Sequence, residues 1–294
     1  MSINIKGSIV ALITPFHPDG SVDYDALGGL LDFHLEHKTD AILVLGTTGE
    51  SSTMTHEEDA AVCAYTVKRV AGKVPVIAGS GSNCTATMLE KSLMYEKLGA
   101  DGLLLISPYY NKANPEGMYR HFATVADAVH IPCILYNVPG RTSCSIPVEV
   151  VERLSRHPNI AAIKEASGDI AYATKVARFL GDDFAMYCGN DDITIPLLSL
   201  GASGVISVSA NVIPEETHNM VLDYLSGDRE KALAAQLRYL PLINGLFMEV
   251  NPIPVKTAAN LMGLKGGSFR LPLYEMTPAH QAQLKTLMEE AGVL

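Results

Sequence analysis

The chain has 294 residues, of which 48% are hydrophobic and 18% are charged, so it can bury a large core and is not a disordered protein. Its 22 basic against 32 acidic residues give a net charge of −10, which disfavours nucleic acid and anionic membranes as partners. No apolar run approaches the ~20 residues of a membrane span, and the sequence has no export pattern. Its five cysteines lack CxxC spacing. The sequence therefore predicts a cytoplasmic protein with reduced thiols.

Eight short runs rich in Ile, Val and Leu follow one another along the chain, and they lack the alternating polarity of half-exposed strands. The predicted strands cover residues 8–13, 41–46, 75–79, 102–107, 132–137, 160–165, 184–189 and 204–208. Amphipathic stretches between them predict helices, for example over residues 23–37, 55–70, 85–98, 115–129 and 147–156. Thr55, which precedes Glu57 and Glu58, and Thr85 are expected at the starts of two of these helices, Thr85 as an N-cap.

Strands that alternate with helices in this way predict an α/β fold, a closed (β/α)₈ TIM barrel. An open doubly wound sheet is the alternative, weakened because no G-x-G-x-x-G pattern follows the first strand. After Val208 no strand-like run recurs, and the chain from about Pro214 reads as helices. We therefore divide the chain into a catalytic barrel, residues 1–224, and a C-terminal helical region, residues 225–294.

Lys164 is the first candidate for chemistry, because it interrupts an apolar run at the end of a predicted strand. In such barrels the C-terminal strand ends carry the active site. Burying an ammonium costs several kcal/mol unless it is paired or its pKa falls, and a neutral lysine amine can attack a ketone to form a Schiff base. A salt bridge to Glu165 and a phosphate-binding lysine are the alternatives.

Other strand ends supply groups that would complement such an amine. The tight turn at Thr47 and Thr48 offers backbone N–H groups to a carboxylate, or it is an ordinary loop that caps the next helix. Tyr136 would shuttle protons with Tyr110 and Thr47 as relay partners, although a strand-end tyrosine is also typical of a core. Arg141 would pair with a substrate carboxylate or face solvent.

No metal site is predicted. The nine histidines show no H-x-x-x-H spacing or carboxylate cluster at strand ends. The pair Asp191 and Asp192 opens a predicted helix, where the helix dipole explains two carboxylates without a divalent ion.

Six motifs share their order and spacing with one known family, and the likeness runs from about residue 5 to the end of the chain. They cover residues 46–51, 108–111, 136–142, 163–166, 204–208 and 251–256. On these motifs the chain resembles the dihydrodipicolinate synthase / N-acetylneuraminate lyase family. The resemblance implies a class I aldolase-type lyase that condenses pyruvate with L-aspartate 4-semialdehyde to give 4-hydroxy-tetrahydrodipicolinate, in lysine (diaminopimelate) biosynthesis.

The resemblance also implies roles for the catalytic residues. Lys164 forms the pyruvate imine, and no other cofactor is expected. Tyr136 is the proton donor and acceptor, with Thr47 and Tyr110 completing the relay. Tyr110 is expected from a neighbouring subunit, within a homotetramer built as a dimer of dimers.

Substrate binding follows from the same resemblance. The pyruvate carboxylate would lie on the amides of Thr47 and Thr48, with Gly189 and Ile206 lining the pocket. Arg141 would hold the carboxylate of the semialdehyde, which favours the synthase over the alternative, a lyase of N-acetylneuraminate or 2-keto-3-deoxy sugar acids. A barrel that only senses a keto acid would have a degenerate site, and here every proton-transfer residue is present.

A possible allosteric site for lysine is implied at a subunit interface. Four residues of the lysine-inhibited pattern are kept: Ser51, His56, Asn83 and Tyr109. Two depart from it, since Asp59 and Thr87 stand where a histidine and a glutamate are expected. Losing the glutamate removes a partner for the α-amino group of lysine, so we expect weak inhibition or none.

Overall fold

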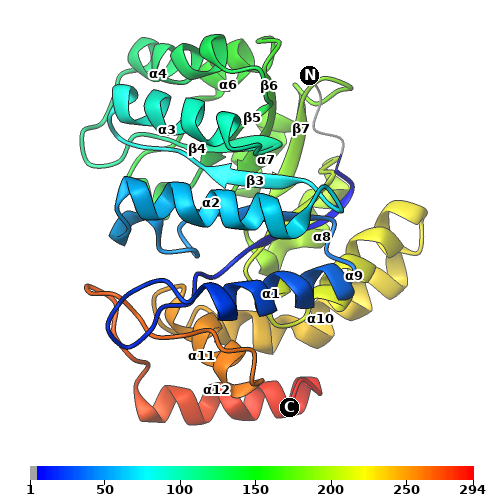
Figure 1. The fold of residues 1–294 in the computed structure, drawn as a ribbon. Helices are drawn as coiled ribbons and strands as arrows, with labels where there is room; N and C mark the ends of the chain where they lie inside the picture. The colour runs from blue at the N-terminus through cyan, green and yellow to red at the C-terminus, as the bar shows by residue number, and fades with distance from the viewer. Residues whose placement is uncertain (1–4) are drawn as a thin grey trace.

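The computed structural model describes residues 5–294 and shows a closed parallel barrel (Figure 1). The eight strands are neighbours in chain order, and β8 pairs with β1 to close the sheet. They are β1 Gly7–Ala11, β2 Ala41–Val44, β3 Val76–Gly79, β4 Gly102–Ile106, β5 Cys133–Asn137, β6 Ile160–Glu165, β7 Ala185–Cys188 and β8 Gly204–Ser207. The predicted TIM barrel is therefore confirmed, and the open sheet is excluded.

Helices follow the strands along the chain. They are α1 Tyr24–Glu36, α2 His56–Val70, α3 Thr85–Lys97, α4 Pro115–Ala128, α5 Pro139–Thr142, α6 Val148–Leu154, α7 Ile170–Ala177 and α8 Thr194–Ser199. Thr55 begins α2 as expected, because its side chain accepts a hydrogen bond from the Glu58 amide and the Glu58 carboxylate accepts one from the Thr55 amide. The N-cap prediction for Thr85 was wrong: Cys84 holds that position, and the Thr85 hydroxyl bonds to His121 Nδ1 at 2.8 Å.

Two apolar layers hold the barrel together. Ile9, Leu43 and Leu104 belong to the layer inside the barrel, whereas Val10 belongs to the layer between the sheet and the helices. Successive strand residues point to opposite faces, so each strand feeds both layers. Full burial of one such side chain contributes roughly 1.5–3 kcal/mol, which explains why the strands read as continuous apolar runs.

The last part of the chain is helical, as predicted. α9 Pro214–Ser226 packs on β1 and β8, and α10 Arg229–Gly245, α11 Ile253–Leu261 and α12 Pro278–Ala291 follow. Figure 1 shows α12, in red, below α11, in orange, and α12 packs on both α10 and α11. The predicted division at residue 224 falls in the last turn of α9, and the two-unit division stays a prediction. In residues 5–294, no helix has both the length and the apolar character that a membrane crossing needs.

Candidate active site

A cavity of about 490 Å³ lies at the C-terminal ends of the strands. Six of the eight predicted catalytic and substrate-binding residues line it: Thr47, Thr48, Tyr136, Arg141, Lys164 and Gly189. The loop before α11 adds Phe247, Val250 and Asn251 to its lining. Residues that are far apart in the sequence therefore meet in one place because they follow different strands of the same barrel.

Lys164 is a buried amine, with 5% of its surface exposed. Within residues 5–294 it has no ion pair with an acidic side chain. Glu165, the expected alternative partner, points to the other side of the strand. Its carboxylate accepts hydrogen bonds from Asn137 Nδ2 at 2.8 Å and from the Ser167 amide at 2.7 Å. The salt-bridge alternative is therefore not what the structure contains.

Tyr136 and Gly189 flank the Lys164 side chain. Tyr136 pairs with Lys164 in the register of β5 and β6, and the Lys164 Nζ lies 4.5 Å from the centroid of the Tyr136 ring. A Cβ at position 189 would lie 3.0 Å from the Lys164 Cε and 2.6 Å from the Ala166 Cβ. Position 189 must therefore be glycine to leave room for the lysine side chain.

The turn after β2 presents two free backbone N–H groups. The Gly49 amide donates to the Gly46 carbonyl at 3.1 Å, and the Glu50 amide donates to the Thr47 carbonyl at 3.2 Å. Among residues 5–294, no protein acceptor takes a hydrogen bond from the amides of Thr47 and Thr48. Consecutive free amides in a tight turn bind an anion such as a carboxylate.

Besides Lys164, one cation and one carboxylate lie in the lining of this cavity. Arg141 lies in the short helix α5, and its Nη2 donates to the Asn251 carbonyl at 3.0 Å, which fixes the guanidinium at the mouth. Glu249 also lines the cavity, but His280 Nδ1 and the Thr277 hydroxyl contact one of its carboxylate oxygens. The hydrogen bond with His280 is the largest cause of the lowered pKa of Glu249.

Two predicted residues lie outside the cavity lining. Ile206 is fully buried and belongs to the apolar layer inside the barrel. Tyr110 is 94% exposed, and its φ of +70° is unusual for a bulky residue. One chain therefore does not bring the Tyr110 hydroxyl to Lys164.

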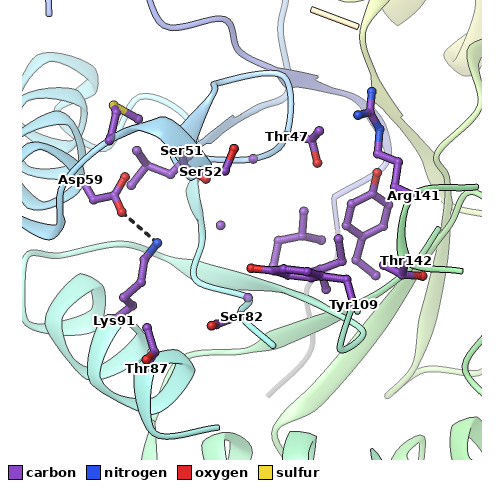
Figure 2. Close-up of a pocket in the computed structure, with 18 of the residues that line it drawn as sticks. Thr47, Ser51, Ser52, Asp59, Ser82, Thr87, Lys91, Tyr109, Arg141 and Thr142 are labelled. Atoms are coloured by element: carbon purple, nitrogen blue, oxygen red, sulfur yellow. Dashed lines mark ion pairs between the residues drawn. The ribbon is translucent and has the colours of Figure 1, made fainter. Parts of the chain in front are cut away.

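A second cavity, of about 330 Å³, adjoins the first (Figure 2). The predicted allosteric residues Ser51, His56 and Tyr109 line it together with Asp59 and Thr87. Asn83 is not part of this lining, but its side-chain amide donates to the Tyr109 carbonyl at 3.3 Å. Five residues line both cavities: Gly46, Thr47, Leu104, Tyr136 and Arg141.

Lys91 is a lining residue of this second cavity that the sequence reading missed. Its Nζ lies 2.8 Å from Asp59 Oδ2, and the two side chains are only 10% and 1% exposed (Figure 2). Burial raises the pKa of Asp59, against the opposing effect of the Lys91 charge. Lys91 lies on α3 and Asp59 on α2, so no spacing in the sequence predicts that the two side chains pair.

Asn251 is the second residue whose place the sequence reading missed. Its side-chain amide donates to the Thr48 hydroxyl at 2.9 Å, and its carbonyl accepts from Arg141. Asn251 begins the motif over residues 251–256, but nothing in that motif points to the β2 turn.

Metal ligands do not gather anywhere in residues 5–294: no group of three or more His, Cys, Asp or Glu side chains is placed to hold an ion. The five cysteines, all within that range, are unpaired.

Comparison with known proteins shows a single family over nearly the whole chain. Residues 4–291 match the model of the Dihydrodipicolinate synthetase family. The 4-hydroxy-tetrahydrodipicolinate synthase of Caldicellulosiruptor saccharolyticus is 53% identical over 288 residues, which cover 98% of this chain and 97% of that protein.

Solved structures that are similar to this chain belong to the same family. Dihydrodipicolinate synthase of Cyanidioschyzon merolae with lysine bound is 41% identical, with a TM-score of 0.96 and 99% of each chain covered. The enzyme of Acinetobacter baumannii complexed with pyruvate is 39% identical, with a TM-score of 0.96, covering 99% of this chain and 100% of that one.

Proposed function

This chain belongs to the dihydrodipicolinate synthetase family, and on that premise we propose that the cavity at its barrel mouth condenses pyruvate with L-aspartate 4-semialdehyde. The product is 4-hydroxy-tetrahydrodipicolinate, made for lysine through diaminopimelate. One observation carries the proposal: Lys164 is a buried amine that opens onto a cavity and has no acidic partner in residues 5–294. Class I aldolase chemistry needs such a nucleophile.

The first half of the reaction forms an imine. The Lys164 nitrogen attacks C2 of pyruvate, and the carbinolamine then loses water. We assign the proton transfers to the phenol of Tyr136, which gives a proton to the departing hydroxyl and receives the proton that leaves C3 when the enamine forms. Thr47, and Tyr110 from a neighbouring subunit, pass these protons onward. The placement of Tyr136 beside Lys164, with both side chains lining one cavity, supports this assignment.

The second half joins the two substrates. The enamine carbon attacks the aldehyde carbon of the semialdehyde, and the amino group of the semialdehyde then displaces Lys164 and closes the ring. We propose that the amides of Thr47 and Thr48 hold the pyruvate carboxylate and that Arg141 holds the carboxylate of the semialdehyde. Gly189 provides room for Lys164, and Ile206 supports the pocket from inside the barrel.

The remaining expectations are part of the same proposal. No cofactor is needed, because the imine on Lys164 supplies the electron sink. We place the enzyme in the cytoplasm, as a homotetramer built as a dimer of dimers. We also propose that the second cavity is the place where L-lysine would bind, and that it binds weakly or not at all because Lys91 already neutralises Asp59.

Borohydride trapping tests the proposed nucleophile. Reduction in the presence of pyruvate is expected to leave a pyruvyl adduct on Lys164, seen by mass measurement of the intact chain and of its peptides. Lys164→Ala should abolish the adduct, and Lys175→Ala, a substitution of an exposed lysine on α7, should leave it unchanged. An unmodified wild-type chain would refute the proposal.

A substrate comparison tests the second half. Condensation with L-aspartate 4-semialdehyde should far exceed cleavage of N-acetylneuraminate or 2-keto-3-deoxygluconate by the same preparation. The reverse order would make the protein a sugar-acid lyase that shares the imine step.

A further inference from the structure

Two charged residues that line neither cavity form a buried ion pair behind the β2 turn. Lys256 Nζ lies 2.6 Å from Glu50 Oε1, with the side chains 0% and 1% exposed. The same Nζ donates to the Thr14 carbonyl at 3.0 Å and to the Ser268 carbonyl at 2.5 Å. All three ammonium hydrogens thus have acceptors, so this lysine is fixed in position.

The pair acts on the backbone that carries the free amides. The Glu50 amide donates to the Thr47 carbonyl, which closes the turn, and Glu50 itself has a φ of +54°. For a residue with a side chain, this left-handed conformation costs roughly 1–2 kcal/mol, and it persists where surrounding contacts determine it. The Lys256 contact is such a constraint, since it holds the Glu50 carboxylate inside the protein.

The same C-terminal segment holds the turn at a second point. Asn251, five positions before Lys256 in the chain, donates to the Thr48 hydroxyl and accepts from Arg141. The turn is therefore anchored at Thr48 by Asn251 and at Glu50 by Lys256. Both anchors come from the region around α11, and the barrel strands provide neither of them.

We propose that Glu50 and Lys256 are positioning residues for the reaction, because their ion pair holds the Thr47 and Thr48 amides in the geometry that binds the pyruvate carboxylate. This inference rests on the proposed function. A buried ion pair adds little net stability compared with an apolar pair of similar volume. The Glu50–Lys256 pair lies directly behind the turn, so it can hold the turn in one conformation in addition to any effect on stability.

The test compares steady-state kinetics and hydrogen exchange in three variants. Glu50→Gln keeps the shape of the side chain and removes its charge. Glu50→Gln combined with Lys256→Met removes both charges, so no lone ammonium stays buried. The control is Asp40→Asn, at the opposite end of the barrel, where Asp40 Oδ2 accepts from the Ser8 amide and pairs with His218 Nδ1 at 2.8 Å.

The KM for pyruvate should rise about tenfold in both Glu50 variants, while the KM for the semialdehyde stays within about twofold. Amides of residues 49–50 should exchange faster than in the wild type. Asp40→Asn should change stability without changing either KM or the exchange of the turn.

A purely structural role would instead lower kcat, through loss of folded enzyme, with both KM values constant. That pattern, or unchanged exchange at residues 49–50 in both Glu50 variants, would overturn the inference. A wild type that forms no pyruvyl adduct would refute the proposed function alone, since the exchange measurement still reads the anchoring of the turn.

Discussion

Three lysines among residues 5–294 are buried, Lys91, Lys164 and Lys256, and the last two differ in what surrounds the ammonium. Lys256 contacts a carboxylate and two carbonyls, so its charged form is compensated even though burial lowers its pKa. Lys164 faces a cavity and an aromatic ring, with no acid partner in the described chain. The first environment holds a charge in place, and the second leaves an amine available for covalent chemistry.

The proposed role of Arg141 can be tested by a single substitution. Arg141→Ala should raise the KM for the semialdehyde far more than the KM for pyruvate, because the guanidinium is proposed to bind only the second substrate. A lost charge-assisted bidentate contact is worth about 2 kcal/mol or more, so a change of at least tenfold is expected. Steady-state kinetics with each substrate varied in turn measures both values. Equal effects on both substrates would give the arginine another role.

At the scale of elements, packing between α2 and α3 sets the chemistry of the second cavity. The Lys91 ammonium reaches across from α3 and neutralises Asp59 on α2. A ligand that brings its own ammonium would have to displace that of Lys91. The cavity shares Thr47, Tyr136 and Arg141 with the cavity that holds Lys164, so the two cavities have a wall in common.

L-Lysine is therefore expected to leave the wild-type enzyme uninhibited at concentrations well below about 1 mM. Lys91→Met should increase the sensitivity to L-lysine, because the ligand ammonium can then pair with Asp59. Initial rates across a lysine titration measure this. Lys97→Met, which changes an exposed lysine on the same helix, is the control and should behave as the wild type. Inhibition of the wild type at micromolar lysine would contradict the expectation.

A second contact between elements makes stability depend on pH. Arg270, in the segment before α12, binds the Glu58 carboxylate of α2 through two hydrogen bonds, of 2.7 and 2.5 Å. This contact lowers the pKa of Glu58 from its ordinary value of 4.5 to about 2. Because the pKa is lowered in the folded state, the stabilisation is present above pH 4.5 and is lost as the pH falls toward 2.

Glu58→Gln should accordingly reduce the free energy of unfolding near pH 6 by an amount of order 2 kcal/mol. The difference from the wild type should shrink as the pH falls below 4.5. Urea unfolding at several pH values measures this. Glu116→Gln, which removes the exposed pairs with Arg120 and Arg153, should show a much smaller difference at every pH.

In the whole molecule, one chain does not bring together all members of the proposed proton relay. Tyr110 lies in the loop after β4, is 94% exposed and does not line the cavity that holds Lys164. The proposed dimer would bring the Tyr110 of one subunit to the Lys164 of the other. Catalysis would then depend on assembly, although the barrel is closed within a single chain.

Complementation tests this dependence. Tyr110→Phe should lower kcat by about 100-fold, and Lys164→Ala should remove activity. Co-expression of these two chains should restore part of the activity, because a mixed dimer contains one site with both groups intact. Tyr274→Phe, at another exposed tyrosine, is the control and should be active alone. No gain of activity on co-expression would mean that Tyr110 acts on the Lys164 of its own chain or takes no part in the reaction.

Much of the fold could be predicted from the sequence because buried parallel strands and amphipathic helices have different periodicities. Residues at strand ends, such as Thr47, Tyr136 and Lys164, could also be placed together, because a barrel gathers those ends. Contacts between distant helices carry no such pattern. Lys91 with Asp59, and Lys256 with Glu50, depend on tertiary packing, although Lys256 interrupts an apolar run in the same way as Lys164.

The anchoring of the β2 turn from the last quarter of the chain has a consequence during synthesis. When Ser226 emerges from the ribosome, all eight strands and α9 have already emerged, but Asn251 and Lys256 have not. Because Asn251 and Lys256 hold the β2 turn, we expect the Thr47 and Thr48 amides to reach their final geometry only after the segment around α11 has packed against the barrel. On this view, the proposed carboxylate site is among the last parts of the molecule to form.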